Sequence, residues 1–164
     1  DDKRSLPFLK RVYGVNEDGW YEQLEGRYVE ELIRMNGLEN AKGLNIPGVR
    51  NCQVKNGDQK CDARSHSHYR AGAGLLQYIT DRRPDLTYAV KEFMRHVSGP
   101  TKEDEQNLKQ VVRYLINNPA LKQMIPWGLL SDELNDYVDS DWGAEKDTRR
   151  STSGGAICLS LIHI

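Results

Sequence analysis

Cysteine is scarce in this sequence, and its few copies are poorly placed for disulfide bonds. The chain has three cysteines among its 164 residues, Cys52, Cys61 and Cys158. The number is odd and the spacing fits no familiar disulfide framework, which excludes a small secreted fold held together by bridges. A reducing, intracellular compartment is therefore expected.

Long apolar runs and an excess of charge of one sign are also missing. No stretch approaches the roughly 20 apolar residues of a membrane span, and no secretory leader opens the chain, so we expect no membrane partner. The 23 Lys and Arg residues nearly balance 24 Asp and Glu residues, for a formal net charge of −1. Any surface for nucleic acid must therefore be local.

What the chain does have is a dense polar motif from Tyr137 to Gly155, YVDSDWGAEKDTRRSTSGG. The front of this stretch predicts a strand, on which Asp139 and Asp141 point to one face because they lie two residues apart. Paired carboxylates are typical ligands of Mg²⁺. Arg149 and Arg150, followed by three hydroxyl residues, are typical donors to phosphate oxygens. The motif predicts a metal site acting on a phosphodiester, or else an ordinary solvated hairpin loop.

The first forty residues predict a hairpin followed by a helix. Apolar residues on either side of Asn16–Gly19 indicate two strands within 6–26, joined by a turn. Tyr28, Leu32, Ile33 and Met35 recur at helical spacing, and Asn36-Gly37 supplies a stop signal.

Residues 43–68 are poor in apolar side chains and predict a polar linker or loop. Cys52, Cys61, His66 and His68 lie in it. Their spacing does not match the close ligand pairs of zinc sites, so a zinc-binding loop is only a distant alternative.

Residues 69–117 predict three consecutive helices. The first is expected from about Tyr69 to Ile79, the second begins near Asp85, and the third opens with Thr101 and Asp104 in capping-box spacing. The second helix gathers Leu86, Ala89, Val90, Phe93, Met94 and Val97 on one face, and the third Leu108, Val111, Val112, Leu115 and Ile116.

The first of these helices has two unlike faces. At about 100° per residue, Leu75, Ile79, Gly72 and Leu76 gather on the inner side. Arg70, Gly74, Gln77 and Tyr78 gather on the other. A mid-helix glycine costs about 1 kcal/mol against alanine, which calls for a reason. Either Gly74 admits the backbone of a nucleic-acid duplex, with Arg70, Gln77 and Tyr78 reaching sugar and phosphate, or it admits a neighbouring helix.

Two segments resemble the Pol polyproteins of copia-type LTR retrotransposons. YRAGAGLLQYITDRRPDLTYAV is similar to the thumb signature of their reverse transcriptase, except that Gly72 replaces a bulky aliphatic residue and Gln77 a leucine. The Tyr137–Gly155 motif is similar to the opening of their ribonuclease H domain. The matching residues are Tyr69, Arg70, Gly74, Leu76, Tyr78, Arg83, Pro84, Asp85, Tyr88, Ala89 and Val90, then Tyr137, Asp139, Asp141, Trp142 and Arg149–Gly154.

The resemblance implies an α+β chain cut from a longer protein. A β-hairpin and a helix (1–42, the end of the palm and start of the thumb) and a polar linker (43–68) precede a three-helix, thumb-like bundle (69–130). The first hairpin of a truncated ribonuclease H-like domain follows (131–158). Residues 159–164 depart from the family pattern, and a common sequencing adapter can encode them, so we expect them to be a non-native tail.

The resemblance also implies a function. The parent protein is an RNA-directed DNA polymerase and ribonuclease H that binds an RNA–DNA hybrid or DNA duplex and acts in cytoplasmic particles and in the nucleus. Asp139 is its expected catalytic residue, and Asp139 and Asp141 its Mg²⁺ ligands. Arg70, Gly74, Gln77, Tyr78, Arg149 and Arg150 are the expected nucleic-acid contacts, and the rest of Pol is a partner. The alternative is a non-catalytic relic or a host-adopted helical interaction module.

As given, the chain is expected to have neither polymerase nor nuclease activity, because the resemblance puts the remaining acidic ligands of both active sites outside it. Purified protein should leave an RNA–DNA hybrid intact in Mg²⁺, as measured on a denaturing gel. Cleavage that disappears in Asp139→Asn would contradict this expectation.

Overall fold

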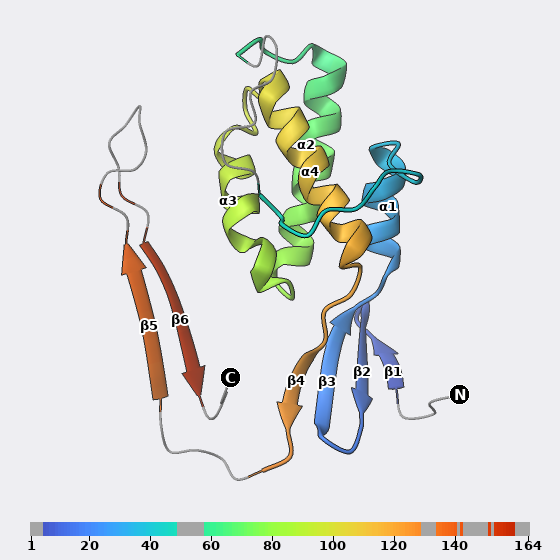
Figure 1. Cartoon of the computed structure of the whole chain (residues 1–164), viewed down its shortest axis with the longest axis vertical. Helices are drawn as coiled ribbons and strands as arrows, with labels where there is room; N and C mark the ends of the chain where they lie inside the picture. Colours follow the sequence, from blue (N-terminus) through green and yellow to red (C-terminus); the bar gives the residue numbers. More distant parts are fainter. Residues whose placement is uncertain are drawn as a thin grey trace. The chain divides into compact units, whose positions relative to one another are not determined.

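The computed structural model describes residues 5–48, 58–128, 134–140, 142, 151 and 153–159. The chain forms two compact units, Asp1–Pro126 and Trp127–Ile164. The first combines an antiparallel sheet with helices, and the second contributes two strands, so the predicted α+β class is confirmed (Figure 1). None of the helices in the described ranges has both the length and the apolar character of a membrane span.

The sheet of the first unit has four antiparallel strands in the order β1-β2-β3-β4. The predicted hairpin is β2 (Arg11–Val15) and β3 (Gly19–Leu24), in which Val15 pairs with Trp20. The Asn16 side-chain oxygen accepts the backbone N–H groups of Asp18 and Gly19 at 3.1 and 2.9 Å. These hydrogen bonds stabilise the turn between the two strands.

Two strands of this sheet were not predicted. β1 (Ser5–Phe8) pairs with β2, and β4 (Gln123–Pro126) pairs with β3, although residues 69–130 were expected to form a helical bundle. At the β3–β4 contact a Cβ atom on Gly19 would overlap the backbone carbonyl of Ile125. The last strand therefore comes close because the residue facing it has no side chain.

Helices α1 and α2 bear out the predicted helices, with one correction. α1 (Arg27–Met35) ends where expected, and Gly37 adopts a left-handed φ of 62° after it. Glycine tolerates this conformation at a helix end because it has no Cβ atom. α2 (Ala63–Thr80) begins earlier than the predicted Tyr69, so the end of the expected linker is helical. The Asp62 carboxylate accepts the N–H of Ser65 at 2.8 Å. This N-cap starts the helix. The first turns of α2 contain few apolar residues, so the sequence showed no helical periodicity before Tyr69.

The remaining helices also follow the prediction closely. A short 3₁₀ helix, η1 (Pro84–Leu86), forms the first turn before α3 (Thr87–Arg95). α4 (Lys102–Asn117) begins with the predicted capping box. There the Thr101 side chain accepts the N–H of Asp104 at 3.3 Å, and the Asp104 carboxylate accepts the N–H of Thr101 at 2.8 Å.

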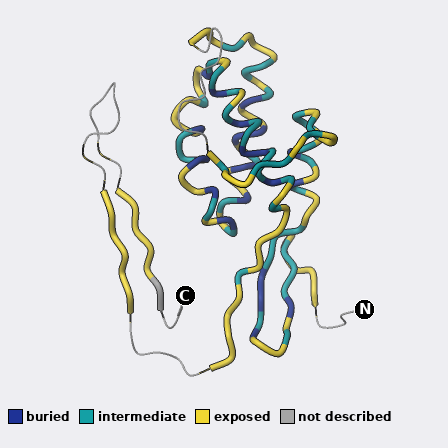
Figure 2. The backbone as a smooth tube through the Cα atoms, viewed as in Figure 1, coloured by how far each residue is buried: buried dark blue, intermediate teal, exposed yellow. Residues whose placement is uncertain are grey.

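The hydrophobic core lies where the four α-helices meet, so the predicted three-helix bundle also includes α1 (Figure 2). The Tyr69 ring is 1% exposed, and its hydroxyl donates to the Phe93 carbonyl at 3.1 Å. Met94 was expected inside but is 37% exposed. The fully enclosed residues include Leu32, Ala73, Leu76, Ile79, Leu86, Val90, Leu108, Val111, Val112 and Leu115.

A buried arginine joins the end of α2 to the end of α4. Arg83 is 3% exposed, and its guanidinium donates to both Asp85 carboxylate oxygens at 3.0 and 2.8 Å and to the Asn118 carbonyl at 2.9 Å. Tyr114 on α4 donates to the same carboxylate at 2.9 Å. This pairing gives the Arg-Pro-Asp motif a structural role.

The second unit is a hairpin of β5 (Leu134–Ser140) and β6 (Ser153–Leu159). Asp139 pairs with Gly154, and every β5 residue is exposed. The two predicted strands are confirmed, whereas their place in a ribonuclease H-like domain stays a prediction.

Asp85→Asn should destabilise the protein by about 3 kcal/mol at neutral pH. The substitution leaves the buried Arg83 guanidinium without its counter-charge. Burial opposes ionisation of Asp85, but the hydrogen bonds from Arg83 and Tyr114 prevail and lower its pKa. A lowered folded-state pKa means that this stabilisation is complete above the unfolded pKa and disappears as the pH falls through the folded pKa.

Urea denaturation at pH 7 and at acid pH measures both effects. Asp85→Asn should flatten the acid dependence, whereas Tyr114→Phe keeps the ion pair and should cost only about 1 kcal/mol. An unchanged unfolding free energy in Asp85→Asn would contradict the role of this pairing.

Candidate nucleic-acid interface

The predicted outer face of α2 is open to solvent. Arg70, Gly74, Gln77 and Tyr78 are all exposed, and the Tyr78 side chain retains 43% of its accessible surface. On the inner side of the same helix, Tyr69 is 1% exposed and Leu76 is completely buried. The structure therefore bears out the division of the helix into two faces, while the binding role of the outer face stays a prediction.

The two glycines of α2 have different surroundings. Among the described residues, a Cβ atom on Gly74 would meet no neighbouring element within 4 Å, so none of the described helices packs against this glycine. A Cβ atom on Gly72 would lie 3.3 Å from Leu108 Cδ1 on α4. Gly72 is thus the packing glycine, and the missing side chain of Gly74 leaves a notch that faces solvent.

Sequence reasoning missed three residues that surround Tyr78. The Tyr28 ring centroid is 5.1 Å from that of Tyr78, and Lys10 Nζ is 6.0 Å from the Tyr78 ring. The Arg27 guanidinium lies 5.0 Å from the Tyr28 ring. The two cations thus lie beside an exposed ring, Tyr78, and a half-buried ring, Tyr28, a combination suited to sugar and phosphate.

The turn that carries Lys10 explains why it was missed. Leu9 and Lys10 both have positive φ, 48° and 65°, between β1 and β2. Such turns normally contain asparagine or glycine, so no signal marked a hairpin here. Tyr28 was expected to be one of the residues of a helical apolar face. Only its position next to Tyr78 connects it with the candidate interface.

The Tyr78 hydroxyl remains protonated at neutral pH. Partial burial, followed by a hydrogen bond with Tyr28, raises the pKa of Tyr78, although the charges of Arg11 and Arg27 oppose the change. A phenol that keeps its proton can donate a hydrogen bond to a phosphate or sugar oxygen.

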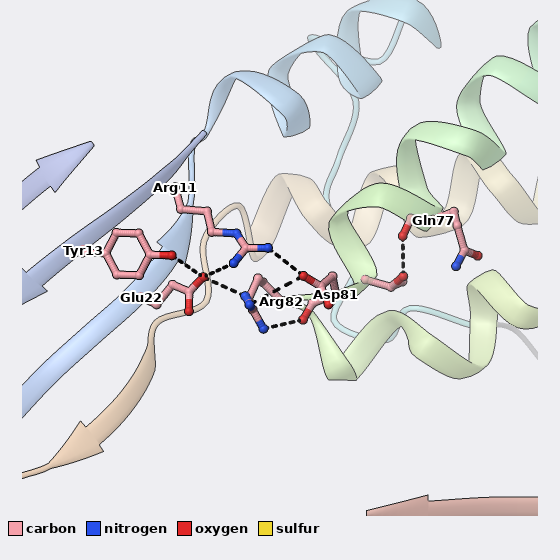
Figure 3. A network of polar contacts seen from close by, with 7 residues as sticks. Arg11, Tyr13, Glu22, Gln77, Asp81 and Arg82 are labelled. Atoms are coloured by element: carbon pink, nitrogen blue, oxygen red, sulfur yellow. Dashed lines mark hydrogen bonds and ion pairs between the residues drawn. The ribbon is translucent and has the colours of Figure 1, made fainter. Parts of the chain in front are cut away.

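A polar network connects the sheet to the end of α2 beside this face (Figure 3). The Glu22 carboxylate is 3.0 Å from Arg11 Nη1 and 2.7 Å from Arg82 Nε, and it accepts the Tyr13 hydroxyl at 3.4 Å. Asp81 lies 2.9 Å from Arg11 Nη2 and 3.7 Å from Arg82 Nη2. These contacts hold the hairpin and α2 in one orientation.

The acidic corner is only partly described. Asp139 is exposed on β5, and its carboxylate accepts the N–H of Ser140 at 2.9 Å. Asp141, Arg149 and Arg150 lie outside the described residues. Within the described ranges no three His, Cys, Asp or Glu side chains form a group that could hold a metal ion. The Mg²⁺ site expected at Asp139 and Asp141 therefore stays a prediction.

Two of the four candidate zinc ligands, Cys61 and His66, contact backbone carbonyls. Cys61 Sγ donates to the Thr101 carbonyl at 3.3 Å, and His66 Nε2 is 3.0 Å from the Val97 carbonyl. Cys52 is outside the described ranges. His68 is half-buried on α2.

Comparison with known proteins identifies the origin of the chain. It is 31% identical over 135 residues to the retrovirus-related Pol polyprotein from transposon RE1 of Arabidopsis thaliana, and 30% identical over 135 residues to that from transposon RE2. The chain belongs to the Pol polyproteins of copia-type retrotransposons. The predicted resemblance is confirmed.

Each of these alignments covers 81% of the chain and 9% of the Pol polyprotein, so the chain spans about a tenth of the length of these relatives. An uncharacterised mitochondrial protein of A. thaliana is 33% identical over 135 residues, which are 78% of the chain and 52% of that protein. No family model matches the chain. No solved structure matches it either.

Gly74→Ala in this Pol segment should raise the free energy of unfolding by about 1 kcal/mol, because alanine favours the helix. The added methyl group enters open space. Thermal unfolding measures the change. Gly72→Ala is the matched comparison on the same helix, and its methyl group must displace Leu108. Destabilisation by Gly74→Ala would show that a neighbouring group does need this space.

Proposed function

We propose that this Pol segment binds a nucleic-acid duplex, an RNA–DNA hybrid or duplex DNA, through the outer face of α2. The observation that carries the proposal is the solvent-facing notch at Gly74, between exposed Arg70 and Tyr78. A helix interior retains a glycine at a cost in stability. No contact within the described part of the molecule accounts for Gly74, and the close approach of a ligand would require a residue without a side chain at this position.

Each residue of the outer face has a role in this proposal. Arg70 offers guanidinium donors to phosphate, and Gln77 offers an amide to sugar or base-edge oxygens. Tyr78 offers a ring that can lie against a ribose. Lys10, in the turn between β1 and β2, adds positive charge next to Tyr78, whereas Arg27 lies over the Tyr28 ring and is paired with Glu25 at 2.6 Å. A chain with almost no net charge thus has a local cationic surface.

The proposal places the segment in the thumb of an RNA-directed DNA polymerase joined to a ribonuclease H. There Asp139 and Asp141 would hold Mg²⁺, which would activate water for cleavage of the RNA strand. Arg149 and Arg150 would contact the phosphodiester backbone. The remainder of Pol is the proposed partner, in cytoplasmic particles and in the nucleus.

A second candidate is a non-catalytic relic or a host-adopted interaction module. It is favoured by the mitochondrial relative, which is not named as a Pol polyprotein and of which the homologous region makes up 52%. A continuous reading frame leading into the rest of Pol would favour the enzyme, and stop codons on both sides would favour the relic.

Duplex binding is tested by fluorescence anisotropy with a labelled RNA–DNA hybrid and the 164-residue chain. Affinity should fall steeply between about 50 and 200 mM salt, because binding releases counterions. Arg70→Gln should weaken binding and lower the slope of log K against log salt by about one. Gly74→Leu should prevent the duplex from approaching the backbone of α2 and so abolish binding, while leaving the fold intact.

Arg34→Gln is the matched control, because it removes the same charge from an exposed arginine in the last turn of α1. It should leave the salt slope unchanged. Salt-independent affinity, or equal effects of Arg34→Gln and Arg70→Gln, would contradict the proposed interface.

A further inference from the structure

A small hollow lies between the sheet and the end of α2, beside the outer face. Its volume is about 260 Å³, and it is lined by Arg11, Leu24, Gln77, Tyr78, Asp81 and Arg82. We propose that this hollow is a subsite for one backbone phosphate, which Arg11 and Arg82 bind. In the unbound protein the Asp81 carboxylate occupies the position of that phosphate. The proposal rests on duplex binding by α2 and extends that interface onto the hairpin.

Glu22 is the positioning residue of this subsite. It is 9% exposed and stands between the two guanidinium groups, 3.0 Å from Arg11 Nη1 and 2.7 Å from Arg82 Nε (Figure 3). A buried carboxylate with two charge-assisted partners fixes the direction in which both arginines point. The two arginines come from different elements, β2 and the turn after α2, so the hollow exists only in the folded unit.

Both arginines keep the means to bind a further anion. Each side chain is 28% exposed. A guanidinium carries five N–H donors in a planar fork that matches phosphate oxygens. Glu22 contacts Arg11 Nη1 and Arg82 Nε, and Arg82 Nη1 donates to the Asp81 backbone carbonyl at 3.3 Å. The two Nη2 groups, which face the Asp81 carboxylate, are therefore the donors proposed for the phosphate. Gln77 and Tyr78 line the same hollow, so the subsite adjoins the outer face of α2.

Asp81 is the competitor for this position. Its side chain is 61% exposed, and its carboxylate lies 2.9 Å from Arg11 Nη2 but 3.7 Å from Arg82 Nη2. An exposed ion pair contributes little free energy and is weakened by salt. A phosphate held nearby by the rest of the duplex can therefore displace this carboxylate, whereas the buried Glu22 stays in place. Asp81 thus acts as an autoinhibitory contact that an arriving phosphate replaces.

The test measures binding of an RNA–DNA hybrid by the full chain, with substitutions at the competing carboxylate and at a phosphate-binding arginine. Asp81→Asn should strengthen binding by about two- to fivefold, because it removes the competitor. Glu39→Gln, which makes the same charge change at an exposed position after α1, is the control and should leave the affinity unchanged. Arg82→Gln should lower the salt slope by about one, and Arg82→Lys should restore it.

Glu22→Gln tests the positioning role by coupling. It should weaken binding in the wild-type background and have no further effect once Arg11 and Arg82 are both glutamine. A purely structural role would give the same loss in both backgrounds, and thermal unfolding of each variant verifies that it folds.

The outcomes separate the two proposals. Loss of binding in Arg70→Gln with no effect of Asp81→Asn beyond that of Glu39→Gln, and a wild-type salt slope in Arg82→Gln, would overturn the phosphate subsite while duplex binding stands. Hybrid binding that does not respond to salt or to Arg70→Gln would overturn the proposed function itself.

Discussion

The burial of one side of α2 is the interaction on which the rest of this molecule depends. Leu76 and Ile79 are completely enclosed by the surrounding helices, and Tyr69 hydrogen-bonds to the Phe93 carbonyl in the same core. A helix that buries a stripe in this way turns its opposite side to solvent, because the two sides are related by the helical repeat. The exposure of Arg70, Gly74 and Tyr78 is therefore a consequence of core packing.

Two ionic junctions stabilise the first unit. One joins the sheet to the end of α2, and the other joins the end of α2 to α4. Glu22 links the hairpin to the end of α2 through two arginines, and Arg83 links the end of α2 to Asp85, Tyr114 and the end of α4. Breaking either junction would leave a buried charge without a partner, which is more costly than the loss of an exposed ion pair. Lys10 and Tyr28 consequently keep their positions relative to Tyr78, and elements distant in sequence form one continuous surface.

A chain with a net charge near zero can still carry a local surface of the kind proposed here for a polyanionic ligand. Two acidic residues are engaged in internal contacts, Asp104 in the cap at the start of α4 and Glu22 in ion pairs under the hairpin. Arg70 and Lys10 remain exposed or over an aromatic ring beside the helix notch. Composition reports the sum of charges, whereas binding depends on where each sign reaches the surface.

By itself, the sequence determined the local elements and the family. Helical periodicity, the Thr101–Asp104 capping box and the Asn16 turn are short-range signals, and each was confirmed by the structure. The motifs around Arg83 and Asp139 identified the copia-type Pol origin. Only the tertiary structure decided the pairing of β4 with β3, the place of Lys10 and Tyr28 beside Tyr78, and the contact of Gly72 with Leu108 on α4. These features arise from contacts between residues far apart in the chain, and such contacts leave no periodic signal along the sequence.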